Sequence, residues 1–252
     1  MNFLANANYH THTVFCDGKD SPEDLVREAI RRGCPAIGFS GHSYYSFDDC
    51  CMSPEGTEEY VSEIRRLKEV YKKSIQIDLG IEQDIFSSID RTAFDYVIGS
   101  VHYVPKNGKN CSVDFSPDDF SENVRDVFDG DYFAFAEAYY QLVGRVYEVT
   151  KCDIVGHFDL ITKFNEADRL FSTKDIRYQK AANEALEQLI EAPVLLEINT
   201  GAMARGYRSS PYPADELIRK WKKAGKKLIL SSDCHEKTDL LYGFSNYIHC
   251  LK

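Results

Sequence analysis

Seven short apolar segments alternate with amphipathic ones, and this alternation limits the folds that the chain can adopt. The apolar segments are Asn8–Thr13, Ala36–His42, Ile75–Glu82, Tyr96–His102, Asp153–His157, Val194–Asn199 and Lys227–His235. Each has about the length of a buried strand. Their apolar content is nearly continuous rather than alternating, which is typical of parallel strands with both faces covered. We therefore expect an α/β fold built of βα units around a parallel sheet.

The segments between the strands carry recognisable helix start and stop signals. Ser21 supplies an N-cap followed by a proline and two acids, and the helical spacing after it ends at Gly33. Further helices are predicted over Glu58–Lys73, from Ser172 to about Glu191, and from Pro213 to Gly225. We interpret their apolar stripes as core faces and assign them no chemistry.

The stretch from Tyr103 to Thr150 is longer and less regular than one crossover connection. Lys106–Lys109 is typical of a hairpin turn, and Cys111–Phe115 of a short returning strand. Pro117–Thr150 predicts two helices separated near Gly130. An elaborated loop at this place is positioned to cover a site.

Side chains that can bind metal are concentrated where the apolar segments end. Six of the seven histidines lie at these ends, namely His10, His12, His42, His102, His157 and His235. Glu82 and Asp233 lie there too. In a parallel barrel all strand ends meet at one rim, which is where such barrels build their active sites. A single histidine at a strand end is more often structural, but six of seven together favour a metal site.

With Asp17, the candidate ligands exceed the needs of one ion. They are His10, His12, Asp17, His42, Glu82, His102, His157, Asp233 and His235. A catalytic zinc commonly takes about three protein ligands and leaves a position for water, so we expect two or three divalent ions. Imidazoles and carboxylates without cysteine suit zinc, manganese or iron alike. Glu82 is the best candidate for a carboxylate that bridges two ions.

Composition excludes several classes of protein. The 252 residues fit a single domain over 1–252. A net charge of −10 disfavours nucleic-acid binding, although metal could reverse the charge locally for a small anionic substrate. No apolar run approaches the roughly 18 residues that span a bilayer, so we expect a cytoplasmic protein without membrane partners. The eight cysteines form no CxxC pair, and most of them are interpreted as small buried hydrophobes. The oligomeric state is not readable.

The motifs HTH, GHS, GIE, SVH, GHFD and SDCH, with Asp17 after the first, occur in that order across essentially the whole chain. This set resembles the polymerase and histidinol phosphatase (PHP) superfamily. The segments SVHYV, VDFS, GHFDLITKFN, EINTGAMARG and PYP are similar to its monofunctional histidinol-phosphate phosphatases. The resemblance implies a distorted (β/α)7, TIM-like barrel with its metal site at the C-terminal rim of the strands.

The resemblance also implies how three ions divide the ligands. One ion would take His10, His12, Glu82 and Asp233, a second Glu82, His102 and His157, and a third Asp17, His42 and His235. Some superfamily members carry histidine where this chain has Asp17. That departure bears on the affinity or identity of the third ion.

The implied reaction is hydrolysis of a phosphomonoester, L-histidinol phosphate of histidine biosynthesis, by attack of a hydroxide that bridges the ions. Arg205 resembles a phosphate-contacting arginine, although on the residues alone a solvated loop cation explains it equally well. Lys163 matches the position of a second basic phosphate ligand. The predicted catalytic residues are Glu82, Asp233, His235 and Arg205, and either Asp233 or His235 would protonate the leaving alcohol.

Other residues near the strand ends have alternative interpretations. Asp159 would orient His157 or cap the following turn. Glu197 and Asn199 would contact substrate or ligands, or Glu197 would satisfy buried donors. Candidates for the ammonium and imidazole of the substrate are Asp114, Tyr103, Tyr44 and Phe47.

Two alternative functions stay open at this point. One is a PHP-type phosphoesterase that acts on a nucleotide, a sugar phosphate or a phosphotyrosine protein. The other is a metal-binding scaffold without catalysis, which the complete ligand set disfavours.

Overall fold

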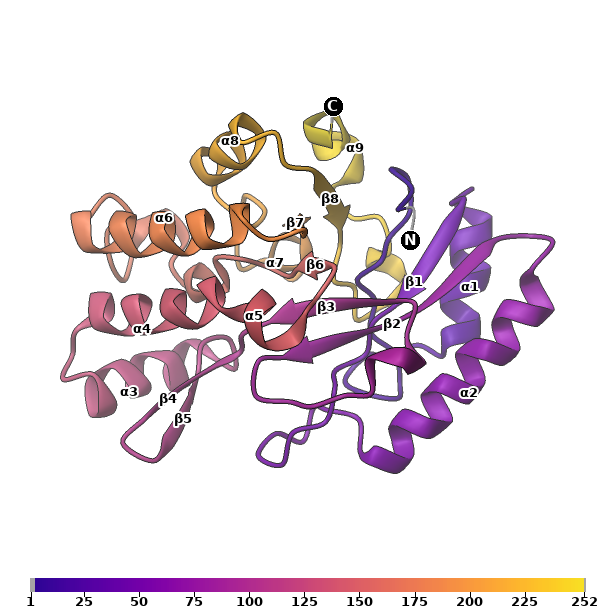
Figure 1. Ribbon diagram of the computed structural model, residues 1–252, viewed down its shortest axis with the longest axis horizontal. Helices are drawn as coiled ribbons and strands as arrows, with labels where there is room; N and C mark the ends of the chain where they lie inside the picture. Colours follow the sequence, from indigo (N-terminus) through magenta and orange to yellow (C-terminus); the bar gives the residue numbers. More distant parts are fainter. Residues whose placement is uncertain (1–2, 252) are drawn as a thin grey trace.

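A parallel sheet forms the centre of the computed structural model, which describes residues 3–251. The sheet has six strands in the order β1-β2-β3-β6-β7-β8, and all five pairings are parallel. The strands are β1 (Ala36–Phe39), β2 (Gln76–Asp84), β3 (Tyr96–Ser100), β6 (Ile154–Val155), β7 (Leu195–Asn199) and β8 (Leu228–Ser231). Figure 1 shows the sheet curling between two groups of helices. The predicted α/β fold and distorted barrel are confirmed.

The first predicted strand, Asn8–Thr13, is not a regular strand. It pairs with the two edges of the sheet through isolated parallel bridges, Asn8 to Ile37 and Thr11 to Cys234. At Thr11 a side chain replaces the backbone acceptor of a regular strand pairing, because the Thr11 amide donates to Ser40 Oγ (3.1 Å). This extended segment therefore lies between β1 and β8 and completes the barrel irregularly.

The helices around the sheet begin where side-chain caps allow. α1 (Pro22–Arg31) is capped by Ser21, as predicted. α2 (Pro54–Tyr71) begins four residues before the predicted Glu58, because Ser53 Oγ accepts from the Gly56 amide (2.9 Å). α6 (Ile176–Ile190) begins later than the predicted Ser172, since Asp175 is the residue that caps it. Shorter helices complete this set: α7 (Gly201–Ala204), α8 (Asp215–Lys223) and α9 (Phe244–Tyr247).

The long insertion between β3 and β6 forms a hairpin and three helices. The hairpin pairs β4 (Tyr103–Lys106) with β5 (Lys109–Ser112), so the returning strand begins two residues earlier than predicted. α3 (Pro117–Val127) and α4 (Tyr132–Gly144) flank Gly130 as expected, and α5 (Val146–Thr150) follows. With α6 they form the left-hand lobe in Figure 1. The remaining short turns are 3-10 helices at Arg91–Ala93, Leu160–Thr162, Glu166–Asp168, Lys237–Asp239 and Ile248–Leu251.

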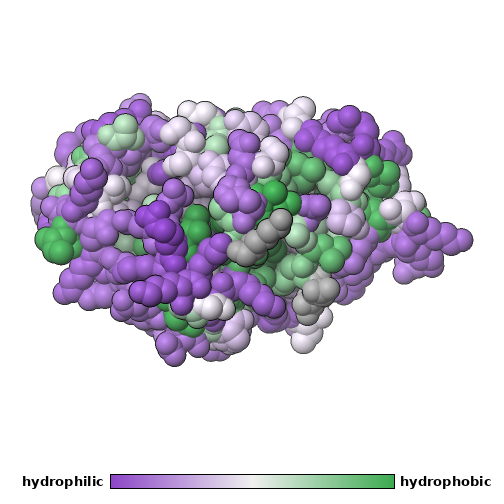
Figure 2. Space-filling model, turned by 90° about the horizontal axis from the view of Figure 1, so that it is seen from above, coloured by the Kyte–Doolittle hydropathy of each residue, from purple (hydrophilic) through white to green (hydrophobic). Residues whose placement is uncertain are grey.

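Surface polarity agrees with the composition. Seen from above, the molecule is largely hydrophilic, with apolar side chains in small patches (Figure 2). Within residues 3–251, no helix has both the length and the apolar character needed to cross a membrane.

Tyr96 fills the interior of the barrel, and glycines make room for it. Its ring is fully buried, and its hydroxyl donates to the Phe39 carbonyl (3.1 Å). A Cβ on Gly80 would lie 2.2 Å from Tyr96 Cζ, and one on Gly38 would lie 2.4 Å from the Tyr96 hydroxyl. The close approach of strand backbone to this ring therefore requires glycine at both positions.

We expect Gly80→Ala to lower the free energy of unfolding by about 1–3 kcal/mol, because an added methyl group overpacks the barrel. Denaturant unfolding measures the change, and Gly56→Ala is the matched control. At Gly56 an added Cβ would meet only Ser53 Oγ, at 3.3 Å. Equal stability of the two variants would contradict this packing account.

Candidate metal centre

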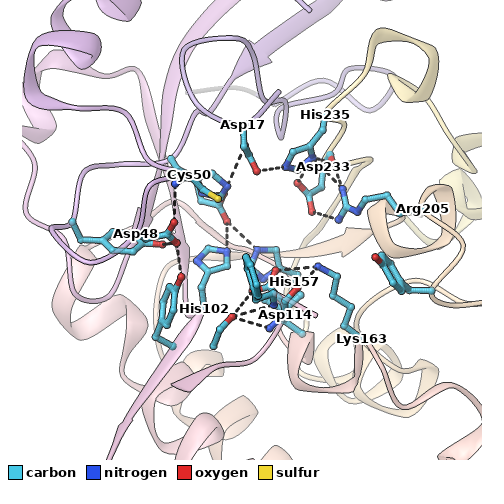
Figure 3. A pocket seen from close by; sticks show the side chains of 18 residues that line it. Asp17, Asp48, Cys50, His102, Asp114, His157, Lys163, Arg205, Asp233 and His235 are labelled. Carbon is cyan, nitrogen blue, oxygen red and sulfur yellow. Dashed lines mark hydrogen bonds and ion pairs between the residues drawn. The ribbon is translucent and has the colours of Figure 1, made fainter. Parts of the chain in front are cut away.

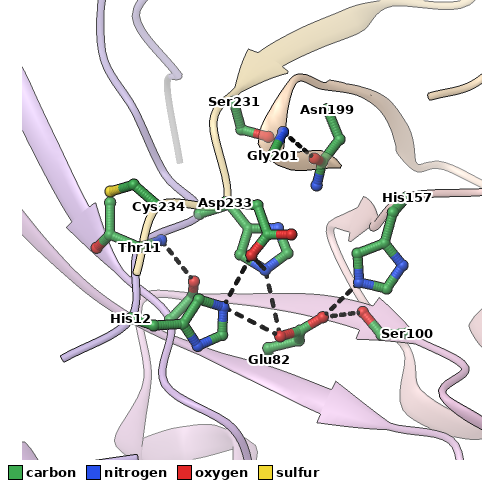
Figure 4. A network of polar contacts seen from close by, with 12 residues as sticks. Thr11, His12, Glu82, Ser100, His157, Asn199, Gly201, Ser231, Asp233 and Cys234 are labelled. Carbon is green, nitrogen blue, oxygen red and sulfur yellow. Dashed lines mark hydrogen bonds and ion pairs between the residues drawn. The ribbon is translucent and has the colours of Figure 1, made fainter. Parts of the chain in front are cut away.

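All nine predicted ligands converge at the carboxyl end of the sheet, with Glu82 at their centre. Five histidines lie within 3.5 Å of its two carboxylate oxygens: His157 Nε2 at 2.9 Å, His42 Nδ1 at 3.0 Å, His10 Nε2 at 3.2 Å, and His12 Nε2 and His102 Nε2 at 3.5 Å. Figure 4 shows His12, Asp233 and His157 arranged around this carboxylate. β2, which carries Glu82, lies between β1 and β3, so that His42 after β1 and His102 after β3 both reach this carboxylate.

The nine side chains form four overlapping groups whose ligand atoms lie within 4.8 Å of one another. The groups are His12, Asp17, His42 and His235; His10, His12 and Asp233; His10, Glu82 and His157; and His42, Glu82 and His102. Four of the nine residues belong to two groups each: Glu82, His10, His12 and His42. Such sharing is the arrangement expected of ions held side by side.

The polar atoms at the centre of this cluster fit a cation. His10 Nε2, His12 Nε2 and Glu82 Oε2 are buried and have no hydrogen-bond partner. Leaving such atoms buried without partners is costly, and imidazole nitrogen with carboxylate oxygen is a donor set that divalent transition metals accept. The residues therefore fit the metal ions that the sequence predicts.

Carboxylates behind the cluster orient its histidines, as metal-ligating imidazoles usually require. Glu197 Oε1 accepts from His10 Nδ1 (2.7 Å), which leaves His10 Nε2 to face the cluster. Asp84 Oδ2 does the same for His102 Nδ1 (3.0 Å). Glu197 thus has one of its predicted roles, contact with a ligand. Asp84 was missed, although its position two residues after Glu82 on one strand was a usable signal.

Charge inside the cluster is balanced between imidazoles and carboxylates. Burial lowers the pKa of His10, His42 and His102, but Glu82 and other nearby carboxylates outweigh burial and leave these pKa values raised. Burial raises the pKa of Glu82, and the histidines outweigh it, so that this pKa falls well below its usual range. Burial beside two other imidazoles lowers the pKa of His12 to about 3.

We expect metal uptake to release protons, because the raised pKa values keep His10, His42 and His102 protonated in metal-free protein and a ligating imidazole must be neutral. Apparent zinc affinity should accordingly rise as the pH is raised above about 6.5, the ordinary pKa of histidine. Calorimetric titration of chelated protein in two buffers with different ionisation enthalpies measures the protons released. A variant of the exposed His249, His249→Gln, should release as many as the unaltered protein. Equal binding enthalpies in both buffers would contradict the expectation.

A cavity of about 260 Å³ opens over the cluster, and both predicted phosphate-binding cations line it. Arg205 Nη2 lies 3.2 Å from Asp233 Oδ2, and its Nη1 donates to the Asp233 carbonyl (2.9 Å). Lys163 Nζ donates to the carbonyl (2.8 Å) and to Oδ2 (3.1 Å) of Asp114. Figure 3 shows both cations on the same side of the cavity.

The other predicted substrate contacts are only partly placed at the cavity. Asp114 and Tyr103 line it, whereas Tyr44 and Phe47 are exposed and are not among the residues that line it. Asp159 was expected either to orient His157 or to cap the turn that follows it. Among the described contacts it does neither: its side chain makes no capping bond at that turn, and its Oδ2 instead accepts from the Ala214 amide (3.0 Å), just before α8. This loop geometry has no signature in the sequence pattern.

The chain resembles one family of known proteins over most of its length. Residues 8–201 match the family model of the PHP domain. The chain belongs to the PHP domain family. A curated histidinol-phosphatase of Lactococcus lactis is 29% identical to this PHP domain, over 92% of this chain and 85% of the relative.

Two solved structures share the fold of this PHP domain. A candidate histidinol phosphatase from Listeria monocytogenes superimposes with a TM-score of 0.84 at 22% identity and covers 96% of this chain and 99% of its own. Histidinol phosphate phosphatase from Lactococcus lactis, complexed with zinc, L-histidinol and phosphate, has a TM-score of 0.72 at 22% identity and covers 99% of this chain and 93% of its own. At this identity, these likenesses establish the architecture.

Proposed function

We propose that this PHP domain is a metal-dependent phosphomonoesterase that hydrolyses L-histidinol phosphate to L-histidinol and phosphate. The observation that carries the proposal is a cavity lined by seven of the nine cluster residues and by two cations, Arg205 and Lys163. A phosphate group requires positive charge on several sides. The substrate follows from the histidinol-phosphatase relatives, and a biosynthetic role of this kind implies a cytoplasmic location.

The cluster would hold two or three ions of zinc, manganese or iron. One set of ligands would be His10, His12, Glu82 and Asp233, another Glu82, His102 and His157, and a third Asp17, His42 and His235. Bound ions would supply Lewis-acid charge for the phosphate oxygens and lower the pKa of water. Part of this division agrees with the observed groups: His10, His12 and Asp233 lie together, and so do Asp17, His42 and His235. His102 and His157 both approach Glu82 Oε1, at 3.5 and 2.9 Å, which supports the remaining set.

The chain's own side chains perform the remaining tasks. Arg205 has a planar guanidinium that can contact two phosphate oxygens, and its contacts with Asp233 hold it over the cluster. Lys163 adds a point charge to the phosphate. Asp233 and His235 are the candidate proton donors to the leaving alcohol, because both line the cavity beside Arg205.

A panel of phosphomonoesters tests the proposal. Metal-loaded protein should hydrolyse L-histidinol phosphate with a kcat/KM at least about 100-fold above that for a nucleoside monophosphate, a sugar phosphate or a phosphotyrosine peptide, since a site shaped for a polar substrate rejects analogues that leave its groups unpaired. A higher kcat/KM for another member of the panel would replace the substrate. Absence of activity on every member would contradict the proposal.

A further inference from the structure

Two carboxylates outside the metal cluster line the cavity, and they differ in how their charge is balanced. Asp114 is paired with Lys163, whose Nζ lies 3.1 Å from its Oδ2. Asp48 accepts only from neutral donors: the Cys50 amide to Oδ1 (2.7 Å), and the Tyr103 (2.5 Å) and Tyr45 (3.2 Å) hydroxyls to Oδ2. Within residues 3–251, no Lys, Arg or His side chain forms an ion pair with Asp48.

These neutral donors hold Asp48 as a fixed negative charge. Burial raises the pKa of Asp48, but the hydrogen bonds from Tyr103 and Cys50, with a smaller attraction from the more distant His42, outweigh it and leave this pKa below its usual value. Aromatic packing fixes the donors in turn, because the rings of Tyr45 and Tyr103 meet edge to face with centroids 5.9 Å apart. Asp48 is thus held ionised by hydrogen bonds and has no ion-pair partner among the described residues, so it can attract a cationic group of a ligand.

Asp48 faces the cavity from the side opposite the phosphate-binding cations. Figure 3 shows Asp48 on one side, Arg205 and Lys163 on the other, and the histidines between them. The cavity is therefore polar in a definite direction, with two cationic side chains at one wall and, at the other, a carboxylate that has no ion-pair partner among the described residues. A ligand that matches it carries a phosphate and, a short distance away, a cationic group.

We propose that Asp48 binds the ammonium group of the substrate and so selects phosphomonoesters that carry an amine close to the ester carbon. The inference rests on the proposed function, because L-histidinol phosphate has its amine on the carbon next to the ester CH2. Tyr103 is a positioning residue, since its hydroxyl donates to the carboxylate that would contact the amine. Asp114 does not have this role, because Lys163 already neutralises it.

The test is Asp48→Asn assayed on L-histidinol phosphate and on its des-amino analogue, 3-(imidazol-4-yl)propyl phosphate. Asparagine keeps the shape and one acceptor oxygen, which can face either the Cys50 amide or the tyrosine hydroxyls, but removes the charge. We expect kcat/KM for L-histidinol phosphate to fall by about 10- to 100-fold, mainly through KM, as when one charged hydrogen bond is lost. The des-amino analogue, a poorer substrate of the unaltered enzyme, should be hydrolysed equally well by both.

Two further variants separate positioning from general damage. Asp49→Asn makes the same charge change at the exposed neighbouring residue, which does not line the cavity, and should alter neither substrate. Tyr103→Phe should weaken L-histidinol phosphate selectively but by less than Asp48→Asn, because the carboxylate survives. Thermal melting of each variant shows whether it is folded.

The outcomes distinguish this inference from the proposed function. Equal losses on both substrates, or no loss on either, would overturn the role of Asp48. If L-histidinol phosphate is not the preferred substrate, the proposed function fails, and the same variants are then assayed on phosphoethanolamine and ethyl phosphate. A selective loss on phosphoethanolamine would still support ammonium recognition, whereas no preference of the unaltered enzyme for the amine in either pair would overturn it.

Discussion

Replacing Glu82 with glutamine is expected to reduce kcat/KM for L-histidinol phosphate by about 1,000-fold or more. The Glu82 carboxylate is the one side chain that approaches His10, His42, His102 and His157 together among residues 3–251. Glutamine has the same shape but only one acceptor oxygen and no charge. Loss of shared ligation would remove several kcal/mol of transition-state stabilisation, and each 1.36 kcal/mol is about tenfold in rate.

Steady-state kinetics, together with the metal content of the same samples, measures the effect. Glu191→Gln, at an exposed position after α6, is the matched control and should leave both quantities unchanged. The Ser100 hydroxyl donates to Glu82 Oε1 (2.6 Å), a contact that the glutamine oxygen can keep, so the barrel should remain folded. Activity of Glu82→Gln within tenfold of the unaltered enzyme would contradict the shared-ligand role.

Replacing Arg205 with lysine is expected to reduce kcat/KM by about 10- to 100-fold, although the positive charge is kept. Arg205 already uses Nη1 and Nη2 to contact Asp233, and it also approaches His235 Nδ1 (3.1 Å). A guanidinium can bridge several acceptors in one plane, whereas an ammonium is a single point charge. Lysine would therefore lose either the contact with Asp233 or the contact with phosphate.

Inhibition by inorganic phosphate distinguishes a phosphate-binding role of Arg205 from a purely structural one. The inhibition constant should rise for Arg205→Lys in parallel with the fall in kcat/KM. It should not change for Arg219→Lys, which makes the same substitution at an exposed position of α8. An unchanged inhibition constant for Arg205→Lys would show that Arg205 acts on Asp233 alone.

The positions of the nine candidate ligands were predictable because two simple periodicities determine them. Side chains two apart on an extended segment share a face, which brings His10 and His12 together. The ends of parallel strands meet at one rim, which brings Glu82 to residues that are distant along the chain. Neither argument needs accurate strand boundaries, so the short β6, with only Ile154 and Val155, did not displace His157 from the cluster.

The features that the sequence did not reveal depend on side-chain contacts between segments that are distant along the chain. The irregular first strand results from Ser40 Oγ taking the Thr11 amide that a ladder would use. Likewise, Lys163 contacts Asp114, 49 residues earlier, because the segment that follows β5 returns to the cavity. Asp48 had no distinguishing pattern in the sequence, since its proposed role rests on the lack of an ion-pair partner among residues 3–251.

Metal content after purification without chelator tests the central claim of this account most directly. Mass spectrometry should find two to three equivalents of zinc, manganese or iron per chain, and Glu82→Gln should lose at least one of them. Activity should increase with added metal until that content is reached. Protein that hydrolyses L-histidinol phosphate at full rate with less than one equivalent of metal would contradict the claim that these nine residues form a polynuclear catalytic centre.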